Sequence, residues 1–203
     1  MRRNKSLRFK GCDIYKGFID KVDQENLLND VRQIASRAPL FSPLTPWGKP
    51  LSVQMTSAGK YGWYSDCNGY QYITRHPNGA VWPEIPESIQ TIWHKLCISS
   101  PEPECCLVNF YSKTAKMGLH QDKDEKNLTH PVLSISLGDD ALFRIGGKDK
   151  RDMTESIWLS SGDVLVMSGK SRLAYHGIDR IKSGSSQLLK FGGRLNLTLR
   201  VVD

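Results

Sequence analysis

Residues 194–200 read RLNLTLR, and this stretch carries the strongest signal for the fold. Polar and apolar residues alternate along it, which is the pattern of a β-strand whose two faces meet different surroundings. The apolar face holds Leu195, Leu197 and Leu199, and the polar face holds Arg194, Asn196, Thr198 and Arg200. A half-exposed strand with solvated arginines is one interpretation. The other is an inward-facing pair of guanidinium groups, which would require carboxylate partners because a buried unpaired cation is costly.

Six segments before this strand also have the composition of short β-strands, and they are separated by turns, many of which contain glycine. They are CCLVNFY (105–111), VLSISL (132–137), ALFRI (141–145), SIWL (156–159), DVLVMS (163–168) and RLAYHG (172–177). Large apolar and β-branched residues dominate them, as they do in strands. Seven short strands with no helix between them predict a β-sandwich or a jelly roll over residues 105–203.

The N-terminal part, residues 1–104, has a different character. Apolar residues recur at helical spacing between Asp23, a suitable N-cap residue, and Pro39, which ends the pattern. A second helix is predicted to start near Pro86. Residues 40–82 are rich in Gly, Pro, Tyr and Trp and predict an irregular aromatic cover. We therefore expect a single domain of mainly β (α+β) class, with these helices and the cover preceding a jelly-roll core.

The amino-acid composition indicates in which compartment the protein works and which kind of partner it binds. The formal net charge of +7 and the pI of about 9.2 favour an anionic partner such as nucleic acid. The five cysteines include no CxxC pair, so we expect reduced thiols in a cytoplasmic protein. Residues 1–20 lack the apolar core of a signal peptide, and no apolar run approaches the roughly 20 residues that span a bilayer. The prediction is a soluble, cytoplasmic monomer with no membrane partner.

The segment GLHQD, residues 118–122, holds candidate metal ligands. On a strand, His120 and Asp122 would point to the same side, because side chains two positions apart share a face. A solvated loop is the alternative. His176 closes another predicted strand and supplies a third ligand, whereas structural or exposed positions explain His76, His94 and His130. Two imidazoles and one carboxylate make the facial triad of non-haem Fe(II) oxygenases, which leaves coordination positions open.

Four longer stretches carry a resemblance to a known family. They are NFYSKTAKMGLHQDKDE (109–125), SISLG (134–138), GDVLVMSGKSRLAYHGI (162–178) and RLNLTLR (194–200). With them the chain resembles the AlkB family of Fe(II)/2-oxoglutarate-dependent dioxygenases, from about Met55 to Val201. The resemblance implies a double-stranded β-helix, a nucleotide-recognition lid in the N-terminal part, and Fe(II), 2-oxoglutarate and O₂ as cofactor and cosubstrates.

The activity implied by the resemblance is oxidative demethylation of alkylated bases. N1-methyladenine and N3-methylcytosine in DNA, with RNA as an open alternative, would be repaired with release of formaldehyde, succinate and CO₂. The methyl group lies on the pairing edge, so the base must be flipped out of a duplex or be single-stranded already. Both bases carry a positive charge, which an aromatic face and a carboxylate attract.

The resemblance also implies a role for each matching residue. The expected metal ligands are His120, Asp122 and His176. The expected 2-oxoglutarate contacts are Asn109, Phe110, Tyr111, Arg194, Asn196, Thr198 and Arg200. The expected substrate contacts are Trp63, Tyr70, Gln71, Tyr72, Asp124 and Lys150.

Among these residues, Arg194 would bind the distal carboxylate of 2-oxoglutarate, and Trp63 would stack on the damaged base. Asp124 would accept a hydrogen bond from the exocyclic amine of the base, while the neighbouring Glu125 is expected to be a solvated acid. Lys150 and Met167 stand where a relative in the family has Arg and Trp. The first change keeps the charge but loses the bidentate fork of a guanidinium.

Two alternatives stay open on the sequence alone. A dioxygenase of the same fold could hydroxylate a protein or a small molecule. A nucleic-acid-binding module without catalysis would also be basic and rich in aromatic residues. Only an enzyme would turn 2-oxoglutarate into succinate when Fe(II), O₂ and a methylated oligonucleotide are supplied.

Overall fold

The computed structural model describes residues 6–45 and 47–203, and strands dominate it. The larger sheet has the order β1-β2-β11-β8-β13-β6-β3, and all its pairs are antiparallel. Its strands are β1 (Leu7–Phe9), β2 (Cys12–Tyr15), β11 (Val164–Met167), β8 (Val132–Gly138), β13 (Arg194–Arg200), β6 (Cys105–Tyr111) and β3 (Val53–Gly59). Three of these strands precede residue 105, so the N-terminal part contributes directly to the sheet.

A smaller antiparallel sheet has the order β10-β9-β12-β7. Its strands are β10 (Glu155–Leu159), β9 (Asp140–Ile145), β12 (His176–Lys182) and β7 (Met117–His120). A 3₁₀ turn, η1 (Gly169–Ser171), precedes β12. The two sheets enclose a shared apolar core, so the expected jelly-roll class of fold is confirmed.

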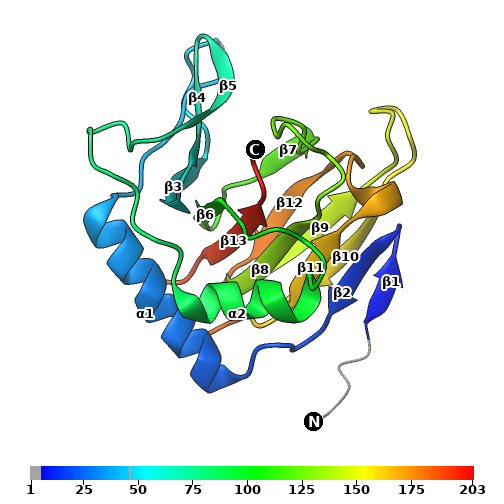
Figure 1. The fold of residues 1–203 in the computed structure, drawn as a ribbon. Coiled ribbons are helices and arrows are strands. Elements are labelled where there is room, and N and C mark those ends of the chain that lie inside the picture. Colours follow the sequence, from blue (N-terminus) through cyan, green and yellow to red (C-terminus); the bar gives the residue numbers. More distant parts are fainter. Residues whose placement is uncertain (1–5, 46) are drawn as a thin grey trace.

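Two helices cover the outer face of the larger sheet, as Figure 1 shows. The first, α1 (Lys21–Arg37), buries Leu27, Leu28, Val31 and Ile34 at helical spacing. Its N-cap is Asp20, whose carboxylate accepts the main-chain N–H of Asp23 at 2.9 Å. The prediction that Asp23 is the N-cap is therefore wrong by one turn. The second, α2 (Glu87–Leu96), starts after Pro86, as predicted. Neither helix is long and apolar enough to cross a membrane.

The two faces of the larger sheet meet two separate cores. On the helix side lie Leu195, Leu197 and Leu199 from β13, together with Val108 from β6. On the inner side, between the sheets, lie Leu107 and Tyr111 from β6. The polar face of β13 is buried with them, because every second residue of that strand has to point the same way. Its arginines are therefore inside the protein and not in solvent.

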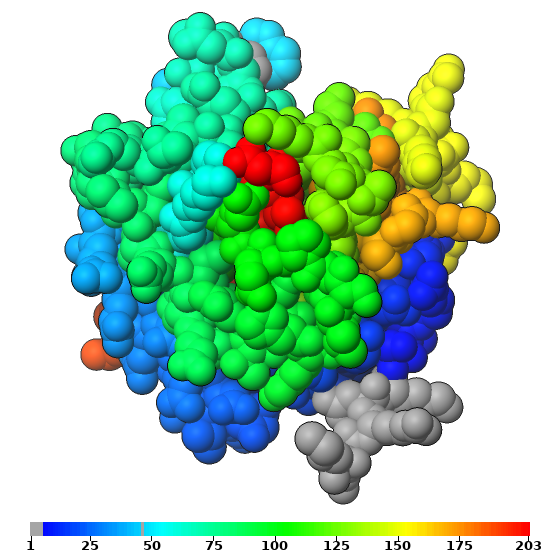
Figure 2. Space-filling model, in the orientation of Figure 1, coloured from blue at the N-terminus to red at the C-terminus, as the bar shows by residue number. Residues whose placement is uncertain are grey.

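The predicted aromatic cover contains more regular structure than expected. Strands β4 (Gly62–Asp66) and β5 (Gly69–Ile73) form a hairpin that projects from the body of the protein in Figures 1 and 2. We call this hairpin the lid. Gly62 lies against the ring of Trp82, where a Cβ atom would come within 2.2 Å of the ring, and Trp82 Nε1 donates to Ile73 O at 2.9 Å. The indole therefore packs under the hairpin and joins it to the body.

All five cysteines are free thiols in the structure. Four are buried, and burial raises the pKa of Cys12 and of Cys105 to about 11 and that of Cys97 to about 12. Cys67, by contrast, is exposed in the turn between β4 and β5.

Gly138 ends β8 with φ at +86°, and a Cβ atom there would lie 2.6 Å from Gly193 O. Gly184 has a similar φ of +78° but nothing within 4 Å. We expect Gly184→Ala to lower the free energy of unfolding by about 1 kcal/mol through backbone strain alone. Gly138→Ala should cost at least about 2 kcal/mol more, because a main-chain carbonyl has to move. Urea unfolding of both variants tests this, and equal losses would contradict it.

Candidate metal centre and adjoining cavity

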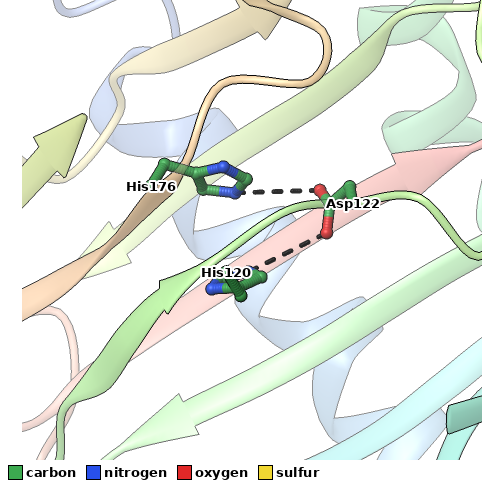
Figure 3. A group of neighbouring side chains, drawn as sticks. All are labelled: His120, Asp122 and His176. Carbon is green, nitrogen blue, oxygen red and sulfur yellow. Dashed lines mark ion pairs between the residues drawn. The ribbon is translucent and has the colours of Figure 1, made fainter. Parts of the chain in front are cut away.

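The three predicted metal ligands lie together between the sheets. His120 ends β7 and His176 begins β12, and the pairing of these strands places the two residues opposite each other. Asp122 follows β7, and its carboxylate oxygens lie 3.8 Å from Nε2 of each histidine. Figure 3 shows the three side chains pointing toward one another. One ligand atom from each of them lies within 4.8 Å of the others.

The hydrogen bonds of the two imidazoles fix which nitrogen is free. His120 Nδ1 lies 3.0 Å from Gly118 O, and His176 Nδ1 lies 3.0 Å from Ala174 O. A carbonyl only accepts, so each Nδ1 carries the proton and each neutral ring keeps its lone pair on Nε2. Both Nε2 atoms face Asp122, and this arrangement of ligand and supporting carbonyl is typical of metal-binding histidines.

Charged neighbours prepare the same residues for metal binding. Burial alone would raise the pKa of the Asp122 carboxyl, but the Arg200 guanidinium and both imidazoles outweigh it and hold this pKa well below its usual value. Arg200 Nη2 donates to Asp122 Oδ1 at 2.8 Å. Burial, with a smaller effect from His120, lowers the pKa of His176 to about 4. A carboxylate and a neutral imidazole are the forms that bind a metal ion.

A cavity of about 330 Å³ extends from the triad between the two sheets. Arg194 lines it and is 1% exposed. Within residues 6–45 and 47–203 the guanidinium donates to uncharged oxygens alone: Ser136 Oγ at 2.7 Å, Leu159 O at 3.2 Å and Asp139 O at 3.4 Å. Its Nε has no hydrogen-bond partner among the described residues, and burial lowers its pKa to about 10. A carboxylate from a ligand would satisfy this group.

Further polar side chains from β6 and β13 line the cavity between Arg194 and the metal centre. They are Asn109, Tyr111, Asn196, Thr198 and Arg200. The Asn109 Oδ1 atom is buried without a partner among the described residues. Phe110 does not line the cavity: it packs against the core on the helix side, because it alternates with Asn109 and Tyr111 along the strand.

The lid forms the other wall of the cavity. Trp63 and Tyr70 stack with ring centroids 5.3 Å apart, and both line the cavity. Trp63 Nε1 donates to Asp124 Oδ2 at 3.0 Å, so the lid contacts the segment that holds the metal ligands. Tyr72 donates to Glu125 at 2.6 Å. Three predicted substrate residues are not part of the cavity wall: Gln71 and Lys150, which are exposed, and Tyr72, which is half-buried.

Two buried charged residues had no expected role. The prediction that Glu125 is solvated is wrong: its side chain is 1% exposed and pairs with Arg172, whose Nη2 lies 2.9 Å from Glu125 Oε2. Arg172 also donates through Nη1 to Asp122 O at 2.5 Å. Their charges alone suggest surface residues, and only their nearness in sequence to Asp122 and His176 hinted at this position.

These observations define the class of protein. An antiparallel double sheet encloses two imidazoles and a carboxylate, and a buried guanidinium with a free donor lies in the same cavity. The donor set suits Fe(II), and the guanidinium suits a carboxylate cosubstrate, as in the non-haem iron oxygenases.

Comparison with known proteins gives the family. The sequence profile that describes the 2OG-Fe(II) oxygenase superfamily matches residues 11–200 of this chain. An alpha-ketoglutarate-dependent dioxygenase AlkB homolog of Caulobacter vibrioides is 49% identical over 191 residues, covering 94% of this chain and 87% of its own length. The chain belongs to the AlkB family of this superfamily, and it is an Fe(II)/2-oxoglutarate-dependent dioxygenase.

Two further relatives extend the comparison. A DNA N(6)-methyladenine demethylase of Arabidopsis thaliana is 31% identical over 220 residues, covering 94% of this chain and 48% of its own length. A solved structure described as OsALKBH1 superposes with a TM-score of 0.83 at 34% identity and covers 97% of this chain and 98% of that one. Membership of the family removes the alternative of a binding module without catalysis.

The low pKa of His176 predicts how the stability of the metal-free protein depends on pH. In the unfolded chain this imidazole takes up a proton below about pH 6.5, whereas in the folded protein it does so only near pH 4. Stability should therefore rise between pH 4 and 6.5, by at most about 3 kcal/mol from this residue. Thermal unfolding of metal-free protein should show a smaller pH slope for His176→Gln than for the unsubstituted chain. Equal slopes would contradict the prediction.

Proposed function

We propose that this protein oxidatively demethylates alkylated bases in nucleic acid, with N1-methyladenine and N3-methylcytosine as substrates. The observation that carries the proposal is the single cavity that joins the His120–Asp122–His176 cluster to buried Arg194 and to the aromatic lid. The Arabidopsis relative, named as a DNA demethylase, supports the substrate class.

The residues on the inner face of β13 and β6 would bind the cosubstrate. His120, Asp122 and His176 would hold Fe(II), which with 2-oxoglutarate and O₂ supplies the oxidation of a C–H bond of the methyl group. Arg194 would bind the distal carboxylate of 2-oxoglutarate, using the Nε donor that is free in the protein. Asn109 and Tyr111 line the space between and would orient the cosubstrate.

The lid would bind the base. A base methylated on its pairing edge carries a positive charge, and the Trp63 ring and the Asp124 carboxylate would attract it. Asp124 already accepts a hydrogen bond from Trp63 Nε1, so its carboxylate lies at the edge of the ring on which the base would stack, and it would accept from the exocyclic amine of that base. The hydroxylated methyl group then leaves as formaldehyde and restores the base.

The net charge of +7 would strengthen binding of the phosphate backbone, with affinity that falls as the salt concentration rises. Lys150, exposed in the loop after β9, would contribute a phosphate contact. The monomeric state and the cytoplasmic location stay predictions.

Mass spectrometry of oligonucleotides that carry one methylated base tests the function. With Fe(II), 2-oxoglutarate and O₂, the oligonucleotide should lose one methyl group and release formaldehyde and succinate in equal amounts. DNA and RNA of the same sequence are compared in parallel. Asp122→Ala should abolish the reaction. Succinate without any loss of methyl would contradict methylated bases as the substrate.

Substitution of Arg194 tests the cosubstrate site. Arg194→Met removes the charged fork, so the KM for 2-oxoglutarate should rise about 10- to 100-fold, while the KM for the oligonucleotide should change much less. Arg32→Met, on the exposed face of α1, is the matched control. A folded Arg194→Met variant with an unchanged KM for 2-oxoglutarate would remove Arg194 from the site.

A further inference from the structure

Glu125 is a buried acid beside the metal centre with no part in the function proposed above. Its carboxylate has partners in three separate parts of the chain. Arg172 Nη2 donates to it at 2.9 Å and Tyr72 OH in the lid at 2.6 Å, whereas Arg200 Nε forms an ion pair with it at 3.4 Å without a hydrogen bond. Burial of a carboxylate is costly, so these partners account for its charge being held inside the protein.

Both arginines that contact Glu125 also hold the metal ligand Asp122. Arg200 donates to the Asp122 carboxylate at 2.8 Å, and Arg172 donates to the Asp122 main-chain oxygen at 2.5 Å. The four residues therefore form a closed ring in which two acids are joined through two guanidinium groups. A substitution of Glu125 would therefore affect Asp122 through Arg172 and also through Arg200.

The ring has a simple charge balance. Two guanidinium groups and two carboxylates sum to zero before a metal ion arrives. Without the charge of Glu125, the ring would carry +1 at a site that has to accept a dication. In a buried environment this repulsion is strong, because little water screens it. Arg172 and Arg200 would also compete for the one remaining carboxylate, which is the metal ligand.

We propose that Glu125 is a positioning residue of the metal centre. It neutralises Arg172 and Arg200 and orients them, so that Asp122 keeps its direction and the site keeps its affinity for a divalent ion. The proposal rests on the metal centre of the proposed function, but it concerns metal affinity and can be tested without any nucleic acid.

The test measures Mn(II) binding to the metal-free protein, residues 1–203, by calorimetry. Local charge should rank the affinities. Glu125→Gln, at +1, should bind Mn(II) at least about tenfold more weakly than the unsubstituted protein. The double variant E125Q/R172Q, back at zero, should recover part of that loss. Tyr72→Phe removes the hydrogen bond to Glu125 and the longer one from Arg200 Nη1, at 3.4 Å, without changing the charge of the ring. It should stay within about twofold of the unsubstituted protein.

Asp163→Asn is the matched control for loss of a buried acid, because Asp163 pairs with Lys16 and is equally shielded from solvent. It should lower stability without changing Mn(II) affinity. If Glu125→Gln does not fold, R172Q is compared with E125Q/R172Q instead. These two variants also differ by the one negative charge of Glu125, so E125Q/R172Q should bind Mn(II) about tenfold more weakly than R172Q.

Two results would overturn the proposal: a folded Glu125→Gln variant that binds Mn(II) within twofold of the unsubstituted protein, or a Tyr72→Phe variant that loses as much affinity as Glu125→Gln. Failure of the unsubstituted protein to bind Mn(II) at all would instead reject the metal centre itself, and with it the proposed function.

Discussion

Side chains on a β-strand alternate between two faces, and β6 and β13 use this alternation to meet two different environments. On one face, leucine and valine side chains pack under the two helices. On the other, Asn109, Arg194 and Arg200 are buried between the sheets, where they line the cavity and are shielded from bulk solvent. The rest of the site follows from this constraint, because polar groups buried in this way need partners inside the protein or in a ligand.

The cavity is electrically polarised along β13. Arg194 and Arg200 are six residues apart, so roughly 20 Å of strand separates their main chains. At the first end, the oxygens that accept hydrogen bonds from Arg194 within the described part of the chain are all uncharged. At the second end, Asp122 and Glu125 surround the other guanidinium, and Asp124 lies nearby under the lid. An anionic cosubstrate and a cationic base are therefore drawn to different ends of the same space.

Much of this could be predicted from the sequence, because the signals were local. The period of two in residues 194–200 predicted a strand with one polar face, and the spacing of His120 and Asp122 made them candidate metal ligands, although a solvated strand and a solvated loop stayed open as alternatives. The features that were missed depend on distant partners. Strands β1 and β2 are only three and four residues long and are ordered by pairing with each other and with β11. Glu125 is buried because Arg172 and Arg200 reach it, and no local pattern reports those contacts. Phe110 was grouped with its neighbours although alternation turns it to the opposite face.

The contrast among the cysteines has a practical consequence for measurement. The buried thiols are shielded and, where burial raises their pKa, hold their protons firmly, so an electrophile such as a maleimide would find them inert. Cys67 alone is open to solvent, in the turn at the end of the hairpin that carries Trp63 and Tyr70. A fluorophore or spin label could be attached to Cys67 without any substitution. Its signal would then report the position of the lid relative to the body of the protein.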